Sequence, residues 1–189
     1  MIRLVGLTGK AGTGKDTFAG MLNKHLNFEP YSFAGPLKDA CCGLFGWTRH
    51  QIDHDREFKE AIDPRWGFSP RRAMQLMGTE YGRQMLRDDI WIHMAKVRLD
   101  ETTKPGLLVT DVRFENEAVW IRENGGLLIH MERPGLPAVA AHASEAGVAY
   151  EEGDVVVVNS GSLDALVVKA QNIATNLRLQ DQYTARSVG

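Results

Sequence analysis

The sequence predicts an α/β fold in which a parallel β-sheet is covered by helices on both faces. Strand-like apolar runs alternate with segments of helical periodicity along the chain. The runs at residues 2–7, 106–114, 127–134 and 154–159 are largely apolar, without a regular polar alternation. Such strands are typical of a parallel sheet that is buried on both sides. With 189 residues, the chain is long enough for one domain with a substantial core.

The other predicted elements complete this pattern. A further short strand is expected at residues 30–34. The helical segments share apolar residues at spacings of three and four, and we expect them at residues 15–26, 36–47, 71–86, 88–99, 116–124 and 163–177. A polar stretch interrupts the apolar pattern after the second helix, so residues 48–105 are expected to form a helical insertion on the sheet. The chain after Leu179 is expected to fray.

Charge and composition exclude several classes of protein. The chain has 22 Lys and Arg and 24 Asp and Glu, a formal net charge of −2. It therefore lacks the basic field that binding to a nucleic-acid polymer requires. Cys41 and Cys42 are adjacent, which disfavours a disulfide between them and matches no metal site. No apolar run is long enough for a signal peptide or a membrane span, so we expect a cytoplasmic protein without a membrane partner.

The stretch GLTGKAGTGKDTF carries the strongest functional signal. Gly9, Gly14 and Lys15 satisfy the spacing G-x-x-x-x-G-K between a predicted strand and a predicted helix, the context of a phosphate-binding P-loop. Backbone N–H groups would surround phosphate oxygens, and Lys15 would reach the β- and γ-phosphates. A glycine-rich turn with solvated lysines is the alternative. The residues expected to bind the nucleotide are Gly9, Lys10, Gly12, Thr13, Gly14, Lys15, Asp16 and Thr17.

Asp16 stands where such a loop usually carries a serine or threonine that ligates Mg²⁺. Its carboxylate could hold the same cation directly or through water, and Thr17 offers a hydroxyl one position later. Alternatively, Asp16 only stabilises the first turn of the helix and Thr17 is the ligand. Both residues therefore stay candidates for a magnesium site.

A second polar site is expected at the end of the apolar run LLVTDVRFENE. Asp111 lies at the carboxyl end of the predicted strand, and open parallel sheets bind their ligands at this end of the strands. It could orient metal-bound water or accept a proton from the attacking oxygen, or it could simply cap a helix. Arg113 and Glu117 follow at short spacing and are expected near the same crevice, which favours the functional interpretation.

The predicted insertion contains a group of residues suited to binding a phosphate. Arg71, Arg72, Gln75 and Arg83 lie around the pair Gly78–Thr79. Guanidinium groups bind phosphate through two parallel hydrogen bonds, although a solvated basic helix face is the alternative. A tryptophan such as Trp91 is more often a core residue than a platform for base stacking.

With these residues in view, the chain resembles the bacteriophage-type deoxynucleoside monophosphate kinases of the P-loop kinase superfamily. The likeness runs nearly end to end, through GKAGTGKDT, SFAGPLK, QLMGTEYGR, VTDVRFENEA, HASE and VVVVNSGSLDAL. It implies one P-loop NTPase-type domain over residues 1–189, in which the insertion binds the monophosphate and a lid segment spans residues 133–152. The aspartate at position 16 belongs to the family pattern.

The resemblance implies ATP-dependent phosphorylation of deoxynucleoside 5′-monophosphates to diphosphates, with Mg²⁺. The implied monophosphate site comprises Lys38, Arg72, Gly78, Thr79, Trp91, Asp111, Arg113 and Glu117. The implied catalytic residues are Lys15, Asp111, Arg113 and Arg133. In the lid segment, His142, Ser144 and Glu145 either contribute polar contacts or order the loop.

Two other functions stay open at this point. One is a different small P-loop kinase, such as a kinase acting on dephospho-coenzyme A. The other is a P-loop ATPase or nucleotide-switch module whose arginines contact a protein. The accepted bases and the formation of a homodimer are also left open.

Overall fold

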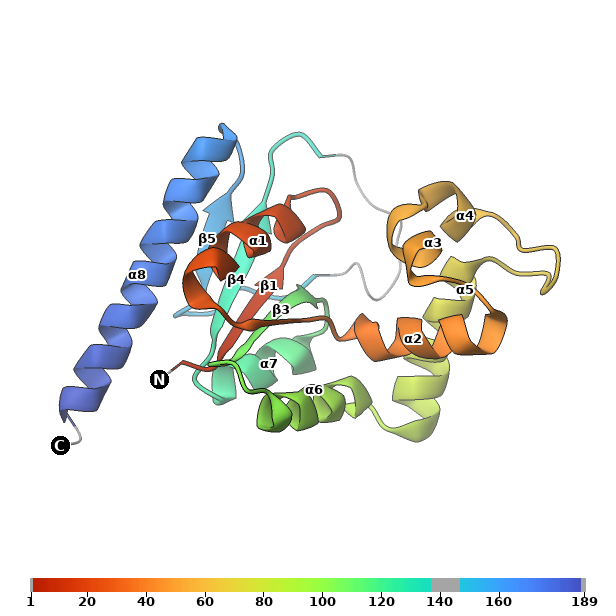
Figure 1. Cartoon of the computed structure of the whole chain (residues 1–189), viewed down its shortest axis with the longest axis horizontal. Helices are drawn as coiled ribbons and strands as arrows, with labels where there is room; N and C mark the ends of the chain where they lie inside the picture. Colours follow the sequence, from red (N-terminus) through yellow and green to blue (C-terminus); the bar gives the residue numbers. More distant parts are fainter. Residues whose placement is uncertain (1, 137–146, 188–189) are drawn as a thin grey trace. The chain divides into compact units, whose positions relative to one another are not determined.

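The computed structural model describes residues 2–136 and 147–187 (Figure 1). The chain divides into two compact units. The first unit comprises residues 1–32 and 98–189, and the second unit comprises residues 33–97. None of the described helices combines the length and the apolar character that crossing a membrane would require.

The first unit contains the predicted parallel sheet. Within the described residues, five parallel strands follow the order β2-β3-β1-β4-β5. Their bounds are β1 (Leu4–Thr8), β2 (Glu29–Tyr31), β3 (Leu107–Val112), β4 (Leu127–Glu132) and β5 (Val155–Val158). After β1 the chain continues to β2 at one edge of the sheet, and after β4 it continues to β5 at the other edge. Open sheets of this type bind ligands at the carboxyl ends of the strands, where the strand order reverses.

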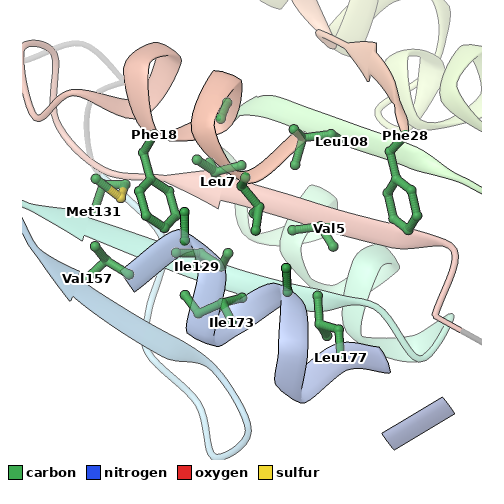
Figure 2. Close-up of a cluster of buried hydrophobic side chains, with 14 of the residues drawn as sticks. Val5, Leu7, Phe18, Phe28, Leu108, Ile129, Met131, Val157, Ile173 and Leu177 are labelled. Atoms are coloured by element: carbon green, nitrogen blue, oxygen red, sulfur yellow. The ribbon is translucent and has the colours of Figure 1, made fainter. Parts of the chain in front are cut away.

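One face of this sheet is covered by α1 (Lys15–Leu26) and α8 (Leu163–Ser187) (Figure 1). Val5 and Leu7 of β1 point to this face and are fully buried. They pack with Phe18 of α1 and Ile173 of α8, as Figure 2 shows. This cluster is the main core of the first unit.

Helix α7 (Glu115–Glu123) covers the opposite face. Gly6 of β1 points toward this helix, and a β-carbon there would lie 2.5 Å from Cδ1 of Ile121. Only glycine therefore lets α7 approach the strand so closely. The predicted fold class, a parallel sheet with helices on both faces, is confirmed.

The second unit is helical. Its elements are α2 (Ala34–Phe45), α3 (Arg49–His54), α4 (Arg56–Glu60), α5 (Pro70–Gln75), the π-helix η1 (Leu76–Leu86) and most of α6 (Ile90–Glu101). Leu37, Cys41, Trp47, Ile52 and Ala73 form its buried core. The unit overlaps the insertion expected at residues 48–105 but begins earlier, because α2 packs with the helices that follow it.

Three local features refine or contradict the expectations. The helix expected at residues 71–86 is present, but its second part, which contains Gly78 and Thr79, is the π-helix η1. The polar stretch after residue 48 forms two short helices, because Thr48 and Asp55 accept hydrogen bonds from backbone N–H groups and cap α3 and α4. The tail does not fray after Leu179, since α8 continues to Ser187 and contains no glycine or proline that would stop it.

Candidate active site

The phosphate loop, residues 9–15, connects β1 to α1 at the carboxyl edge of the sheet. Gly9, Gly12 and Gly14 have φ angles of 134°, 82° and 94°, a region that favours glycine. A β-carbon at Gly9 would collide with the carbonyl oxygen of Met131 at the end of β4. The glycines therefore allow both the sharp turn of the loop and its close approach to the neighbouring strand.

The side chain of Lys15, the last residue of the phosphate loop, folds back over the start of the loop. Its Nζ donates hydrogen bonds to the carbonyl oxygens of Gly9 (2.6 Å) and Lys10 (2.9 Å). Thr13 is buried, and its hydroxyl donates to the same Lys10 oxygen at 2.9 Å. The ammonium group and the N-terminus of α1 thus lie together at the loop, an arrangement suited to a polyphosphate.

Asp16 and Thr17 occupy the first turn of α1, and both side chains are exposed. Magnesium prefers oxygen ligands and usually takes one or two carboxylates together with substrate phosphates and water. The oxygen atoms of Asp16 and Thr17 fit this preference. Which of them ligates the ion stays a prediction.

Asp111 lies near the end of β3, beside the strand that leads into the phosphate loop. Its Oδ2 accepts a hydrogen bond of 2.7 Å from the hydroxyl of Ser32, which follows β2. The pKa of neighbouring Tyr31 is raised to about 12 by burial and by the Asp111 carboxylate. Ser32 was not predicted as a site residue. It lies inside the strand expected at residues 30–34, and its contact with Asp111 depends on the pairing of β2 with β3.

Glu117 is not an open ligand of a substrate site, because its side chain is only 2% exposed. Its carboxylate accepts hydrogen bonds from the N–H groups of Arg113 (2.8 Å) and Phe114 (3.1 Å). Glu117 therefore stabilises the turn between β3 and α7. Through that turn it positions Arg113.

A pocket of about 440 Å³ opens beside the phosphate loop, at the carboxyl ends of β1, β3 and β4. Its wall contains Lys10 and Thr13 of the loop together with Arg113, His130 and Arg133. Three of these side chains carry permanent positive charge. The pocket therefore suits an anionic group next to the loop, and it brings two of the predicted catalytic arginines to that place.

The second unit holds the predicted phosphate-binding arginines in three different environments. Arg71 forms an ion pair of 2.6 Å with Glu60. Arg83 is buried, and its Nη1 donates to the carbonyl oxygen of Asp88. Arg72 is exposed on α5. Of these three, Arg72 is therefore the arginine most accessible to a ligand.

Lys38, another predicted ligand of the monophosphate, is held on α2. Its Nζ lies 2.7 Å from Oδ1 of Asp53, and Arg49 pairs with the other oxygen of the same carboxylate. A phosphate ligand would therefore compete with Asp53 for Lys38.

Trp91 packs against η1. Its Nε1 donates to the carbonyl oxygen of Gly78 at 2.9 Å, and a β-carbon at Gly82 would lie 2.8 Å from the indole ring. A β-carbon at Gly78 would lie 2.8 Å from Leu37. Glycine at positions 78 and 82 therefore leaves room for the side chains of Leu37 and Trp91. Thr79 lies between the two glycines, half-buried in the same π-helix. Contacts of Gly78, Thr79 and Trp91 with a substrate stay predictions.

Comparison with known proteins decides the family. The family model described as deoxynucleotide monophosphate kinase matches residues 47–170. The chain belongs to this family. The match does not include the phosphate loop, so the geometry of the loop is a separate observation.

Viral relatives of this kinase extend the likeness over most of the chain. A protein of Acanthamoeba polyphaga mimivirus, provisionally named deoxynucleotide monophosphate kinase, is 36% identical over 174 residues, covering 85% of this chain and 90% of the relative. The deoxynucleotide monophosphate kinase of Enterobacteria phage T4 is 26% identical over 238 residues, covering 90% and 98%. The predicted family is therefore confirmed.

Solved structures support the fold of this kinase. TT1252 from Thermus thermophilus has a TM-score of 0.54 at 16% identity, and shikimate kinase from Aquifex aeolicus has a TM-score of 0.51 at 15% identity. Each likeness covers 93% of this chain and 98% of the other. At such identities the likeness concerns the fold alone, and it confirms the α/β fold with a parallel sheet.

A group of polar and charged residues in this kinase was not predicted from the sequence. His130 on β4 borders the pocket, and its Nε2 lies 2.9 Å from Oδ2 of Asp154. Asp154 is buried and also pairs with Arg122 of α7. These residues are far apart in the sequence and carry no shared motif. His142, Ser144 and Glu145, which the resemblance placed in the lid segment, lie outside the described residues.

Proposed function

We propose that this kinase transfers the γ-phosphoryl group of ATP to the 5′-phosphate of a deoxynucleoside monophosphate in the presence of Mg²⁺. The observation that carries the proposal is a phosphate loop at the carboxyl edge of the parallel sheet, in a chain of this family. Phosphoryl transfer depends mainly on positioning and on neutralising charge. The residues at this edge can do both.

The phosphate loop and Lys15 would hold the donor. Loop N–H groups and the N-terminus of α1 supply partial positive charge for the β- and γ-phosphates. Lys15 would exchange its bonds to the carbonyl oxygens of Gly9 and Lys10 for bonds to phosphate oxygens, which are stronger acceptors. Asp16 or Thr17 would hold Mg²⁺, which supplies charge neutralisation at the phosphates when bound.

Asp111 would act near the transferred group. It lies on β3, which pairs with the strand that leads into the loop, and Ser32 donates a hydrogen bond to its carboxylate. The carboxylate would orient metal-bound water or accept a proton from the acceptor. Arg113 and Arg133 border the pocket beside the loop and would offset the negative charge that develops during transfer.

The family resemblance assigns Asp111 and Arg113 of the first unit to the acceptor, and Glu117 positions Arg113. It also assigns Lys38, Arg72, Gly78, Thr79 and Trp91, which lie in the second unit. The exposure of Arg72 supports its part in this proposal. A guanidinium can bind the monophosphate through two parallel hydrogen bonds.

One panel of assays tests the function. ATP and Mg²⁺ are incubated with each deoxynucleoside and ribonucleoside monophosphate, and with dephospho-coenzyme A, and the formation of ADP and of the phosphorylated product is measured. We expect ADP formation to require a deoxynucleoside monophosphate. ADP formation at the same rate without any acceptor would instead indicate an ATPase, and a product formed only from dephospho-coenzyme A would indicate the other kinase.

A further inference from the structure

Asn159 connects the phosphate loop to the end of β5. Nδ2 of Asn159, directly after β5, donates a hydrogen bond of 3.0 Å to the carbonyl oxygen of Thr13, which lies 146 positions earlier in the chain. We propose that Asn159 is a positioning residue for the donor nucleotide: it orients the Thr13–Gly14 peptide so that the N–H of Gly14 stays available to a phosphate oxygen.

The stereochemistry of the peptide bond explains this role. In a trans peptide the C=O and the N–H of one unit point in opposite directions. Because the carbonyl of Thr13 points to Asn159, the N–H of Gly14 points away from Asn159. This is the N–H that precedes Lys15, at the start of α1. It is one of the groups through which a phosphate loop binds its anion.

The loop needs an external contact of this kind. Gly14 has a φ angle of 94°, but glycine adopts positive and negative φ with almost equal ease. The glycine therefore permits the required peptide orientation without enforcing it. A rotation of the Thr13–Gly14 peptide would turn the carbonyl oxygen toward the phosphates, where it would repel them. The hydrogen bond from Asn159 opposes that rotation.

Asn159 is itself held in place by the fold. Its own N–H donates to the carbonyl oxygen of Glu132 at 2.7 Å, at the end of β4. The carbonyl oxygen on the other side of the same peptide, that of Val158, accepts a hydrogen bond of 2.6 Å from Lys169 of α8. The peptide before Asn159 is thus fixed to a strand and to a helix. The side chain of Asn159 therefore contacts the loop from a fixed position.

The fit between the amide and the loop is close. A β-carbon at Gly14 would lie 2.7 Å from Nδ2 of Asn159. Since the carbonyl oxygen of Thr13 can only accept a hydrogen bond, the NH₂ end of the amide must face it. Aspartate at position 159 would have the same shape but would place an oxygen against this carbonyl. The isosteric variant therefore tests the hydrogen bond separately from the packing.

The experiment compares Asn159→Ala and Asn159→Asp with the wild type and with Asn124→Ala. Asn124 is a matched control, because its Nδ2 also donates to a backbone carbonyl, that of Trp120 (2.8 Å), at the end of α7. ATP and ADP are titrated with Mg²⁺ by calorimetry, KM is measured for ATP and for the monophosphate, and the melting temperature is recorded for each variant.

We expect Asn159→Ala to weaken ATP binding and to raise KM for ATP about fivefold to tenfold, the effect of one lost hydrogen bond. Asn159→Asp should weaken ATP binding and raise KM for ATP further, since it adds a negative charge beside the loop. KM for the monophosphate should change by less than about twofold, and Asn124→Ala should leave both KM values unchanged.

Two outcomes would overturn the inference. In the first, Asn159→Ala and Asn159→Asp bind ATP as well as the wild type does. In the second, both variants lose ATP binding and monophosphate binding equally. The inference depends on the proposed function for the choice of ATP as the probe. A wild type that binds ATP without transferring phosphate would contradict the proposed function, while the titrations would still test Asn159. A wild type that does not bind ATP would overturn both.

Discussion

The guanidinium of Arg122 and the carboxylate of Asp154 form a two-point ion pair in the first unit. Nε of Arg122 lies 3.1 Å from Oδ1, and Nη2 lies 2.6 Å from Oδ2. Their side chains are only 15% and 3% exposed. Arg122 also donates to the carbonyl oxygen of Ala149 and pairs with Glu115 and Glu151. The pair therefore connects α7 to the segment that precedes β5.

Asp154→Asn is expected to destabilise the protein by about 3 kcal/mol, because Arg122 loses its buried partner and keeps only the half-exposed carboxylates of Glu115 and Glu151. The measurement is the free energy of unfolding in urea at pH 7. Glu101→Gln is the control, since it removes only an exposed pair with Arg98 at 3.9 Å and should cost less than about 0.5 kcal/mol. Equal effects of the two substitutions would contradict the buried role of Asp154.

The same pair predicts a pH dependence. Burial alone would raise the pKa of Asp154, but hydrogen bonds from Arg122, the Glu151 amide and His130 outweigh it and hold the pKa below the ordinary 3.8. Unfolding returns the pKa to that value, so the stabilisation is complete at higher pH and is lost as the pH falls through the folded pKa. The stability difference between wild type and Asp154→Asn should shrink as the pH falls below about pH 4. A difference that grows toward low pH would contradict this assignment.

Lys15→Ala is expected to reduce phosphoryl transfer by about a hundredfold or more, the typical effect of losing a preorganised electrostatic group. The measurement is kcat with saturating ATP and monophosphate. Lys24→Ala, on the exposed face of the same helix, is the control and should retain full turnover. Near-normal turnover of Lys15→Ala would remove the phosphate loop from the mechanism.

Asp16→Ala and Thr17→Ala are expected to raise the Mg²⁺ concentration needed for half-maximal activity by unequal amounts. The variant with the larger effect identifies the direct ligand, because the other residue acts only through water or through the helix terminus. The measurement is a titration of initial rate against free Mg²⁺ for both variants and the wild type. Two negligible effects would show that neither side chain contributes to metal binding.

Asp111→Asn is expected to lower kcat more than it weakens ATP binding, because the proposed role concerns the metal shell or the acceptor phosphate. Ser32→Ala should lower kcat in the same direction but less, since it removes only the hydrogen bond to one oxygen of Asp111. Turnover and calorimetric ATP binding are compared, together with the melting temperature. A purely structural Asp111 would lower the melting temperature and leave turnover per folded molecule intact.

Arg72→Lys and Arg113→Lys are each expected to lower kcat/KM for the monophosphate by about tenfold to a hundredfold. Lysine keeps the charge but loses the planar pair of donors that binds phosphate, a loss of roughly 1.5–3 kcal/mol. Affinity for ATP alone should barely change. Arg71→Lys is the control, since Arg71 already pairs with Glu60. Unchanged monophosphate kinetics in both test variants would contradict the assigned acceptor site.

Local patterns were sufficient to predict much of this protein. The helix predicted at residues 15–26 is α1, and the apolar runs predicted as strands overlap β1, β3, β4 and β5. Apolar periodicity and glycine spacing are properties of short segments, so they need no knowledge of the tertiary structure. The sequence therefore determined the fold class, the phosphate loop and the family.

Other features depend on contacts between residues far apart in the chain, and only the tertiary structure decided them. Ser32 meets Asp111 because β2 pairs with β3, and Asn159 meets Thr13 because the ends of β5 and β1 lie at the same edge of one parallel sheet. Glu117 looked like a ligand in a polar stretch, but packing of α7 buries it and turns its carboxylate to the backbone of Arg113. Strand order and helix packing set these contacts, and no spacing along the chain encodes them.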